Sequence, residues 1–528
     1  MVRIRCYITY IQKRPGYIII VFILSFLVSC ATIPVRRETK KVSEIATIDP
    51  SFKYIKAHMQ DGSVYILYDW HFDTTAISLN GYGSFLDINR NIISSHGNLK
   101  SRAKTYVEPY KIDISDISLL ETNDPGPSLA GGLTVVTGVT AGIGVYCLIN
   151  PKACFGSCPT FYASNGDTLE IQAEGFSSSI SPSLEKNDID MLYTARVKND
   201  FELVVTNEAL ETHSIRYANL LVFEKQSGER VFYSPEGIFY KTEAILPPTG
   251  CQNNNGECLA NVVNADRIEL FSLADPNNLD SKEEIIVTFE VENDENVGLL
   301  VGKRQTLLTT FLMYQGLAYM GKSTTYWMAE FERNKIAPKE NIFELLGGIE
   351  VFSKDTCGNW ILEGEINETG PIATDFNIIP LANNLHGKVE LKLRLNKGLW
   401  RIDYLGLATI SEKVAPILIQ PYQVETITGT EIYPLNNLID TNKYLITYPG
   451  DSYRIKYRLP FENAELFLDS KGFYLEWIRD EWVTEQNFRK LNLMFNHPSR
   501  YLKLCAPDFK KIEPHMEETF WNSRYEKR

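Results

Sequence analysis

Short runs of alternating apolar and polar residues dominate this chain. In "KVELKLRL" the apolar residues Val389, Leu391 and Leu393 occupy every second position, and "SYRIKYRLP" repeats the pattern. Successive side chains of a β-strand point to opposite faces, so each run predicts a strand with one buried face. The "NKG" turn after the first run leads into "LWRIDYLG", and the two runs together predict an antiparallel hairpin. "RYANLLVFEK" is apolar on both faces, which is typical of a central strand.

Helical spacing of apolar residues is clearest between residues 303 and 320. Most apolar side chains there, among them Phe311 and Leu312, fall on one broad face. This pattern predicts an amphipathic helix that is buried against a core, with Lys303 and Arg304 capping one end. Polar residues interrupt the apolar face, so the helix is not expected to span a membrane.

Turn residues and composition divide the chain into successive segments. The predicted fold class is mainly β with α, and it combines a small N-terminal β-barrel or roll with β-sandwich-like domains and a helical C-terminal tail. The expected segments are a signal peptide at 1–29, a tether at 30–50, a small β domain at 51–123, an apolar Gly-rich segment with a Cys cluster at 124–158, a β-sandwich-like domain containing the helix at 159–345, a second β region at 346–470, and a helical tail at 471–528, whose helices are expected at about 475–491 and 507–525.

The N-terminal residues predict an export signal that ends at Cys30. Basic residues but no acidic residue precede an apolar run at 17–28, which is long enough for a signal peptide and short for a membrane span. The sequence "LVSC" at 27–30 resembles the bacterial lipobox. This resemblance implies that Cys30 receives lipid and becomes the mature N-terminus. The alternative is a signal anchor with an incidental cysteine.

The residues after Cys30 bear on the membrane that receives the protein. Ala31 follows the cysteine, and no acidic residue occurs between 31 and 37. In Gram-negative lipoproteins an Asp at the second position favours the inner membrane, and in Bacteroidota acidic residues there favour surface export. By this resemblance we expect the outer membrane, with the protein facing the periplasm. Basic residues in the tether can contact anionic head groups or simply be solvated.

A charge-free segment covers residues 129–149, "LAGGLTVVTGVTAGIGVYCLI". On a helix, Ala130, Thr134, Gly138 and Gly142 would form one smooth stripe that permits close packing. Its glycines disfavour an isolated helix. Three interpretations stay open: a segment packed under the neighbouring domains, a membrane-inserted or partner-binding helix, and a flexible linker.

The cysteines predict disulfides rather than a metal centre. Cys251 and Cys258 bracket the polar loop "QNNNGE", and Cys154 and Cys158 lie close together near Cys147. An exported location permits disulfides. We therefore expect a disulfide between Cys251 and Cys258 and at least one in the cluster of Cys147, Cys154 and Cys158. The second cluster has no nearby histidine to complete a zinc site, and no metal is expected.

Charge excludes one class of partner. The chain has a formal net charge of −13, which becomes −17 when the basic signal is removed. Such a chain is not expected to bind nucleic acid through its overall field.

A cassette of spaced residues resembles one found in uncharacterised bacterial, Bacteroidota-like envelope lipoproteins. That family carries C-P-x-x-Y, then a turn with D-G, and later N-E-x-x-E-T. The likeness extends over about residues 145–480, and it implies no established activity. The matching residues here are Cys158, Pro159, Tyr162, Asn207, Glu208, Glu211 and Thr212.

Two pairs of polar residues are candidates for chemistry. Glu211 and His213 lie two apart, on one face of a strand, and can bind a cation; the alternative is a turn that satisfies backbone amides. Glu476 and Asp480 lie four apart, on one face of a helix, beside tryptophans. Paired carboxylates suggest glycoside hydrolysis, and the alternative is a solvated helix. No H-E-x-x-H, G-x-S-x-G or P-loop motif occurs, so no catalytic residue is assigned.

These features favour a lipid-anchored envelope protein that acts as a non-enzymatic binding or scaffold module. Its expected partners are the membrane, through the N-terminal lipid, and an envelope protein; no cofactor is expected. One alternative is a lipid-anchored hydrolase that acts on glycan or peptide. Another is an outer-membrane assembly or lipid-handling factor that uses the apolar segment.

Overall fold

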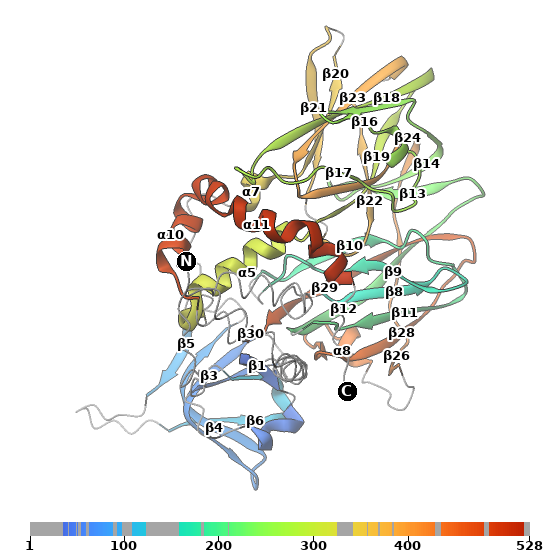
Figure 1. Cartoon of the computed structure of the whole chain (residues 1–528). Coiled ribbons are helices and arrows are strands. Elements are labelled where there is room, and N and C mark those ends of the chain that lie inside the picture. Colours follow the sequence, from blue (N-terminus) through green and yellow to red (C-terminus); the bar gives the residue numbers. More distant parts are fainter. Residues whose placement is uncertain are drawn as a thin grey trace, which may run out of the picture. The chain divides into compact units, whose positions relative to one another are not determined.

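The computed structural model in Figure 1 describes most of the chain between residues 35 and 521. Several predicted features lie outside the described residues: the signal peptide, the lipid-bearing Cys30, the segment 129–149, Cys154 and Asp480. The described ranges are 35–40, 42–48, 50, 54–59, 63–87, 92–97, 108–122, 158–180, 184–209, 211–324, 342–355, 357–367, 370–382, 385–427, 435–479 and 485–521.

The predicted small N-terminal β-barrel is confirmed, but it also includes residues 35–40 and 42–47, which the sequence placed in the tether. Its strands form an eight-stranded antiparallel sheet that curves into a small barrel, drawn in blue in Figure 1. Ile55, Leu67 and Leu120 are fully buried in its core. Its elements are β1 (Val35–Lys40), η1 (Val42–Thr47), β2 (Tyr54–Met59), β3 (Val64–Asp73), β4 (Ser78–Leu86), β5 (Ile92–His96), β6 (Tyr110–Asp113), η2 (Ile114–Asp116), β7 (Ile117–Thr122) and, from the far end of the chain, β30 (Ile478–Arg479).

Two further sheets form a sandwich that we call the outer sandwich, because its strands precede and follow those of a second sandwich in the sequence. One, the β12 sheet, has the order β10-β29-β12-β25 with β27 paired to β12, and the other, the β11 sheet, has the order β26-β28-β11-β8-β9. Apolar residues of both sheets, such as Leu203 and Leu220, are buried between them. The strands are β8 (Thr160–Ser164), β9 (Leu169–Glu174), β10 (Lys186–Met191), β11 (Asp200–Thr206), β12 (Glu211–Glu224), β25 (Ile417–Ile419), β26 (Gln423–Thr426), β27 (Leu445–Thr447), β28 (Ser452–Arg458) and β29 (Ala464–Glu476).

An inner sandwich is built in the same way. The β19 sheet has the order β14-β13-β22-β19-β24-β17, and the β23 sheet has the order β16-β15-β18-β23-β20-β21. The predicted hairpin of "KVELKLRL" and "LWRIDYLG" forms β23 and β24, but these strands belong to different sheets. The strands are β13 (Arg230–Tyr233), β14 (Phe239–Leu246), β15 (Gly250–Asn253), β16 (Gly256–Glu257), β17 (Leu270–Phe271), β18 (Lys282–Glu295), β19 (Val297–Gln305), β20 (Ile349–Lys354), β21 (Trp360–Ile366), β22 (Asp375–Pro380), β23 (Leu385–Asn396) and β24 (Trp400–Val414).

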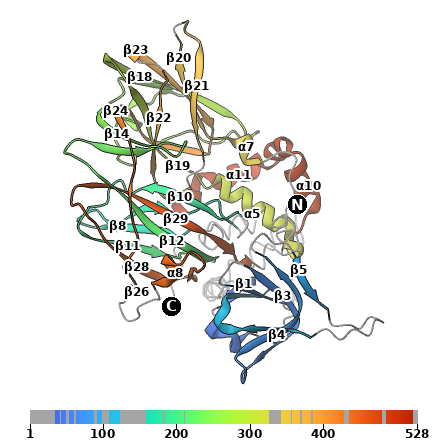
Figure 2. The ribbon, with the colours of Figure 1, turned by 180° about the vertical axis from the view of Figure 1, so that it is seen from behind.

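The inner sandwich is inserted into the outer one. All of its strands lie between residues 230 and 414, whereas the outer sandwich combines 160–224 with 417–476. The connectivity therefore differs from the predicted linear order, in which 159–345 and 346–470 follow one another as separate regions. Figure 2 shows one such pairing of distant segments, that of β12 with β29.

The two sandwiches share a buried layer. Leu221 and Phe467 of the β12 sheet pack with Leu300 and Ile378 of the β19 sheet. The β12 sheet therefore has an apolar core on each side, which explains why β12 is apolar on both faces.

The helices extend the core of the inner sandwich. α5 (Leu308–Met320) is buried on nearly all of its surface, and the Phe311 ring lies 5.3 Å from that of Phe509. α5 begins at Leu308 because Lys303 and Arg304 belong to β19 and do not cap the helix. The remaining helical elements are η4 (Leu259–Asn261), η5 (Gly321–Ser323), α7 (Ile342–Leu346), α8 (Asn436–Ile439), α10 (Phe488–Asn496) and α11 (Pro498–Trp521).

The C-terminal tail is helical, as predicted, but it begins later in the chain. Residues 475 and 476 continue β29, and the first helix of the tail is α10. Among the described helices, none combines the length and apolar character that crossing a bilayer requires.

Candidate functional site: a buried polar cluster

The cassette residues come together where the chain passes between the two sheets of the outer sandwich. β8, which follows Cys158 and Pro159, pairs with β11 so that Tyr162 stands opposite Val204. The Tyr162 hydroxyl donates a 2.6 Å hydrogen bond to Glu208 Oε1. The two halves of the cassette are therefore joined by a buried side-chain contact.

Asn207 fixes the turn that leads from β11 to β12. Its Nδ2 atom donates to the carbonyl oxygen of Glu211 at 2.9 Å and to that of Thr447 at 3.1 Å. A buried backbone carbonyl without a donor is costly, so this one amide side chain stabilises both the turn and the adjacent β27.

Glu211 and His213 form a hydrogen-bonded pair on the same face of β12. His213 Nε2 lies 2.8 Å from Glu211 Oε1, and His213 Nδ1 lies 3.0 Å from Thr447 Oγ1. Both Glu211 and His213 are 0% exposed. The sequence predicted their common face, which follows from a spacing of two residues in a strand.

Glu476 joins this pair from β29. It stands directly opposite Glu211 in the register of β12 and β29, and the Tyr314 hydroxyl of α5 donates to Glu476 Oε1 at 2.5 Å. Because Glu476 belongs to a strand, the predicted helical face shared with Asp480 is wrong for Glu476. Asp480 lies outside the described residues. We call Tyr162, Glu208, Glu211, His213, Tyr314, Thr447, Tyr474 and Glu476 the buried polar cluster.

Burial also governs the electrostatics of this cluster. Tyr474 stands opposite His213, and its hydroxyl donates to the carbonyl oxygen of Ser177 at 3.1 Å. Burial, reinforced by the nearby thiol of Cys158 and the carboxyl of Glu211, raises the pKa of Tyr474 well above its ordinary value. Tyr474 therefore remains a neutral hydrogen-bond donor at every physiological pH.

The arrangement favours a structural role for these side chains. Glu211 and His213 have no exposed surface and Glu476 is 5% exposed, so solvent has little access to their polar atoms. Within the described part of the chain, no three His, Cys, Asp or Glu side chains are grouped as a metal site requires. The cluster joins both sheets of the outer sandwich to α5.

Two charged clusters in the inner sandwich were not found from the sequence. Lys303 is fully buried and contacts Asp375 and Asn377 on β22. Arg304 donates two hydrogen bonds to Glu269, at 2.5 and 2.7 Å, and two to Glu517 of α11, at 2.8 and 3.4 Å. A single sequence shows only adjacent basic residues here, because the acidic partners are distant in the chain.

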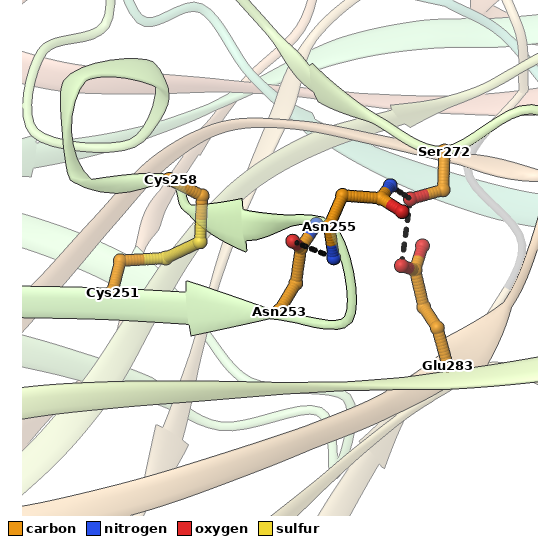
Figure 3. The surroundings of a disulfide bond; sticks show 6 residues. All are labelled: Cys251, Asn253, Asn255, Cys258, Ser272 and Glu283. Atoms are coloured by element: carbon orange, nitrogen blue, oxygen red, sulfur yellow. Dashed lines mark hydrogen bonds between the residues drawn. A yellow bond between two sulfur atoms is a disulfide. The ribbon is translucent and has the colours of Figure 1, made fainter.

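The structure contains a disulfide between Cys251 and Cys258, the pair that the Asn-rich loop indicates (Figure 3). Their Cα atoms lie 5.1 Å apart across the β15–β16 turn. Beyond the turn, Asn255 contacts Ser272, and the Ser272 hydroxyl donates to Glu283 Oε2 at 2.7 Å. The second candidate pair cannot be described, because Cys154 is outside the described residues.

One exposed surface carries aromatic and basic side chains together. Lys392 Nζ lies 4.8 Å from the centroid of the Phe352 ring and 5.1 Å from that of Trp360, and Lys354 Nζ lies 4.9 Å from Trp360. Alternate residues of β20 and β23, such as Val351, face the core. We call the solvent-facing set the outer face: Glu350, Phe352, Lys354, Trp360, Leu362, Lys392 and Arg394.

Comparisons with known proteins give no family for this chain. No protein-family model and no curated protein matches it. Solved structures with partial similarity include BuGH86 in complex with neoagarooctaose, with 7% identity over 42% of this chain and a TM-score of 0.16. They also include dimeric latent PorU from Porphyromonas gingivalis, with 9% identity over 83% of this chain and a TM-score of 0.15. A GH31 alpha-xylosidase from Xanthomonas citri has 8% identity over 81% and a TM-score of 0.14.

The chain covers 34%, 31% and 37% of those three structures, about a third of their length. TM-scores this low carry no argument about the fold or function of the chain.

Proposed function

We propose that the protein is a lipid-anchored bacterial cell-envelope protein that acts as a non-enzymatic binding or scaffold module. One observation carries this proposal: the described candidate residues Glu211, His213 and Glu476 are buried and bonded within the protein, whereas aromatic and basic side chains are partly exposed on the outer face. Exposed aromatic and arginine side chains are the residue types that most often anchor protein–protein contacts. The proposed partner is an envelope protein with an acidic and apolar surface.

The basic side chains of the outer face support that choice of partner. The side chains of Lys354 and Arg394 are 40% and 45% exposed, although each already contacts a glutamate. Leu362 adds an apolar side chain that is 52% exposed. A partner carrying carboxylates around an apolar centre would complement this arrangement.

Site-specific photo-crosslinking in intact cells tests the binding surface. A photoreactive amino acid at Leu362 is expected to give a discrete protein adduct, and the same residue at Leu504 of α11 is the matched control because both leucines are 52% exposed. Arg394→Glu is expected to weaken the adduct at 362, because it repels an acidic partner. Equal adducts at both positions, or none at 362, would contradict this surface.

The lipid anchor belongs to the same proposal, and it is tested separately. Metabolic labelling with a clickable fatty acid is expected to mark the wild type and not Cys30→Ser. Cys6→Ser removes the other cysteine of the predicted signal and should leave labelling unchanged. Protease added to intact cells is expected to spare the protein and to digest it once the outer membrane is opened. Labelling of Cys30→Ser would contradict the anchor, and digestion in intact cells would contradict the periplasmic orientation.

A hydrolase is the second candidate, since Glu211 and Glu476 face one another across two strands. Burial argues against it, because a glycan or peptide must reach the carboxylates that cleave it. The third candidate, an assembly or lipid-handling factor, depends on residues 129–149, which lie outside the described residues.

A further inference from the structure

Lys303 is a fully buried amine at the centre of the β19 sheet. Its Nζ atom lies 2.7 Å from Asp375 Oδ2 and 2.6 Å from Asn377 Oδ1. β19 and β22 pair antiparallel with Lys303 opposite Asp375, and Asn377 follows two residues later on the same face. The amine of one strand therefore contacts both a carboxylate and a carboxamide of its neighbour.

The Asn377 carboxamide is held at both of its polar atoms. Its Oδ1 atom faces Lys303, and its Nδ2 atom donates to the carbonyl oxygen of Tyr233 at 3.4 Å. The carboxamide is thus fixed beside the amine, with its oxygen on Lys303 and its nitrogen on the carbonyl group of Tyr233. Lys303, Asp375 and Asn377 are 0%, 6% and 7% exposed, so bulk water has little access to the group.

A second acid lies close to this group. Asp190 is 4% exposed, and the next residue, Met191, donates its backbone N–H to Asp375 Oδ1 at 3.4 Å. Asp190 Oδ2 has no hydrogen-bond partner among the described residues. Burial, followed by the charges of Asp188 and Asp375, raises the pKa of Asp190 well above its ordinary value. Burial therefore favours the neutral form of Asp190.

Transfer of one proton from Lys303 to Asp375 would convert this ion pair into a neutral amine and a neutral acid. Burial lowers the pKa of Lys303, although Asp375 opposes this effect. A neutral amine beside a neutral acid avoids two buried charges, which an apolar core disfavours. Only the neutral amine has the lone pair that can attack a carbonyl carbon.

We propose that Lys303 and Asn377 form an intramolecular amide bond between β19 and β22. The neutral amine Nζ of Lys303 bonds to Asn377 Cγ, and the protonated Asp375 gives its proton to Nδ2. The bond between Cγ and Nδ2 then breaks, Nδ2 leaves as ammonia, and Asp375 Oδ2 takes the proton that the amine loses. The reaction joins an amine to a carboxamide with loss of one ammonia, and it needs no oxidant, reductant or cofactor.

This bond would tie two central strands of the inner sandwich covalently. Separation of β19 from β22 would then require breaking an amide, so the inner sandwich would resist unfolding and proteolysis even in denaturant. The inference is independent of the partner and of the lipid anchor proposed above.

Peptide mapping of the full-length protein purified from membranes tests the bond. After reduction of the disulfide, trypsin is expected to release the unlinked chain as separate peptides 283–303 and 355–388. Trypsin does not cleave after a lysine whose amine is acylated, so the linked chain yields 283–304 joined to 355–388. The joined peptide should be lighter than the sum of its two parts by one ammonia, and fragmentation should place the branch at Lys303 and Asn377.

Two other results would overturn the assignment. Separate, unmodified peptides would mean that Lys303 forms only an ion pair. A joined peptide lighter by one water would place the bond at Asp375.

Two variants test the roles of the side chains. Lys303→Arg keeps the positive charge but cannot form this bond, and it is expected to lose the joined peptide. Asp375→Asn keeps the shape but removes the proton acceptor, and it is expected to lose the joined peptide as well; an unchanged yield would overturn the role given to Asp375. The wild-type map decides the proposal even if either variant fails to fold.

Discussion

Glu211 stands directly opposite Glu476 in the antiparallel pairing of β12 with β29. Two carboxylates in this position repel one another, so each needs a compensating partner. His213 contacts one oxygen of Glu211, and Tyr314 donates to one oxygen of Glu476. These contacts of the buried polar cluster therefore offset the repulsion between the two carboxylates, and loss of one contact leaves a buried polar group without its partner.

Removal of Glu211 is expected to destabilise the protein strongly. Glu211→Ala deprives the buried His213 of its carboxylate, which should lower the free energy of unfolding by about 3 kcal/mol. Glu211→Gln keeps an acceptor and should cost less. Urea unfolding measures both changes. Glu224→Ala, at the exposed end of the same strand, is the control and should stay within about 0.5 kcal/mol of the wild type. A loss for Glu211→Ala as small as for this control would contradict a structural role for the cluster.

The C-terminal helix is expected to depend on one glutamate. Glu517 of α11 accepts hydrogen bonds from both Arg304 and Arg401. Glu517→Ala leaves Arg304, which is 8% exposed, with fewer partners, and should lower the free energy of unfolding by about 2–3 kcal/mol. Limited proteolysis should then release the helix earlier. Glu518→Ala changes the exposed neighbour and should behave as the wild type does. If both variants are cleaved alike, the Arg304 contact does not hold the helix.

Asp469 predicts a pH dependence of stability. Burial raises the pKa of Asp469 from 3.8 to about 6, although Tyr217 and Lys471 oppose the shift. The folded protein therefore keeps a proton that the unfolded chain has already lost, so the free energy of unfolding should fall as the pH rises from about 4 to about 6. Solvent screening of this partly buried group keeps the total loss of unfolding free energy below about 3 kcal/mol, and the loss is complete above about pH 6.

Asp469→Asn tests this contribution, because it keeps an acceptor for Tyr217 and cannot ionise. The variant should be more stable than the wild type at pH 7 and no more stable at pH 4, as measured by urea unfolding at both values. If the difference in unfolding free energy between the variant and the wild type is the same at both pH values, the Asp469 carboxyl does not cause the pH dependence.

Two cysteines are expected to differ sharply in reactivity. Cys357 is exposed, whereas Cys505 is buried in α11 and burial raises its pKa to about 12. The thiolate is the reactive form of cysteine. The Cys505 thiol is therefore both inaccessible to the reagent and largely un-ionised. Iodoacetamide should modify Cys357 in the native protein and Cys505 only after unfolding, as read by peptide mass spectrometry. Modification of Cys505 at the rate of Cys357 would mean that α11 opens readily.

The local patterns that depend on neighbouring residues were readable from the sequence. Alternation predicted the strands, a spacing of two placed Glu211 and His213 on one face, and a short polar loop indicated the Cys251–Cys258 pair. These features need only the geometry of a few consecutive residues. The start of α5 was harder to predict from the sequence. Lys303 and Arg304 belong to β19, but their position just before the helix resembles that of capping residues.

The site itself could not be assembled from the sequence. Glu476 reads as helical because charged residues and tryptophans follow it, yet both faces of β29 are buried and no alternation marks the strand. Its neighbours Glu211 and Tyr314 come from distant parts of the chain. Such pairing depends on tertiary packing, which overrides local preference.

The insertion of one sandwich into the other sets an order of events during synthesis. Strands β10, β11 and β12 leave the ribosome long before β28 and β29, with which they pair, whereas residues 230–414 contain every strand of the inner sandwich. The inner sandwich can close first, and the earlier strands must wait with unpaired edges that are open to association with other chains. Newly made protein is therefore most exposed to aggregation after the inner sandwich has folded and before residue 476 has been added.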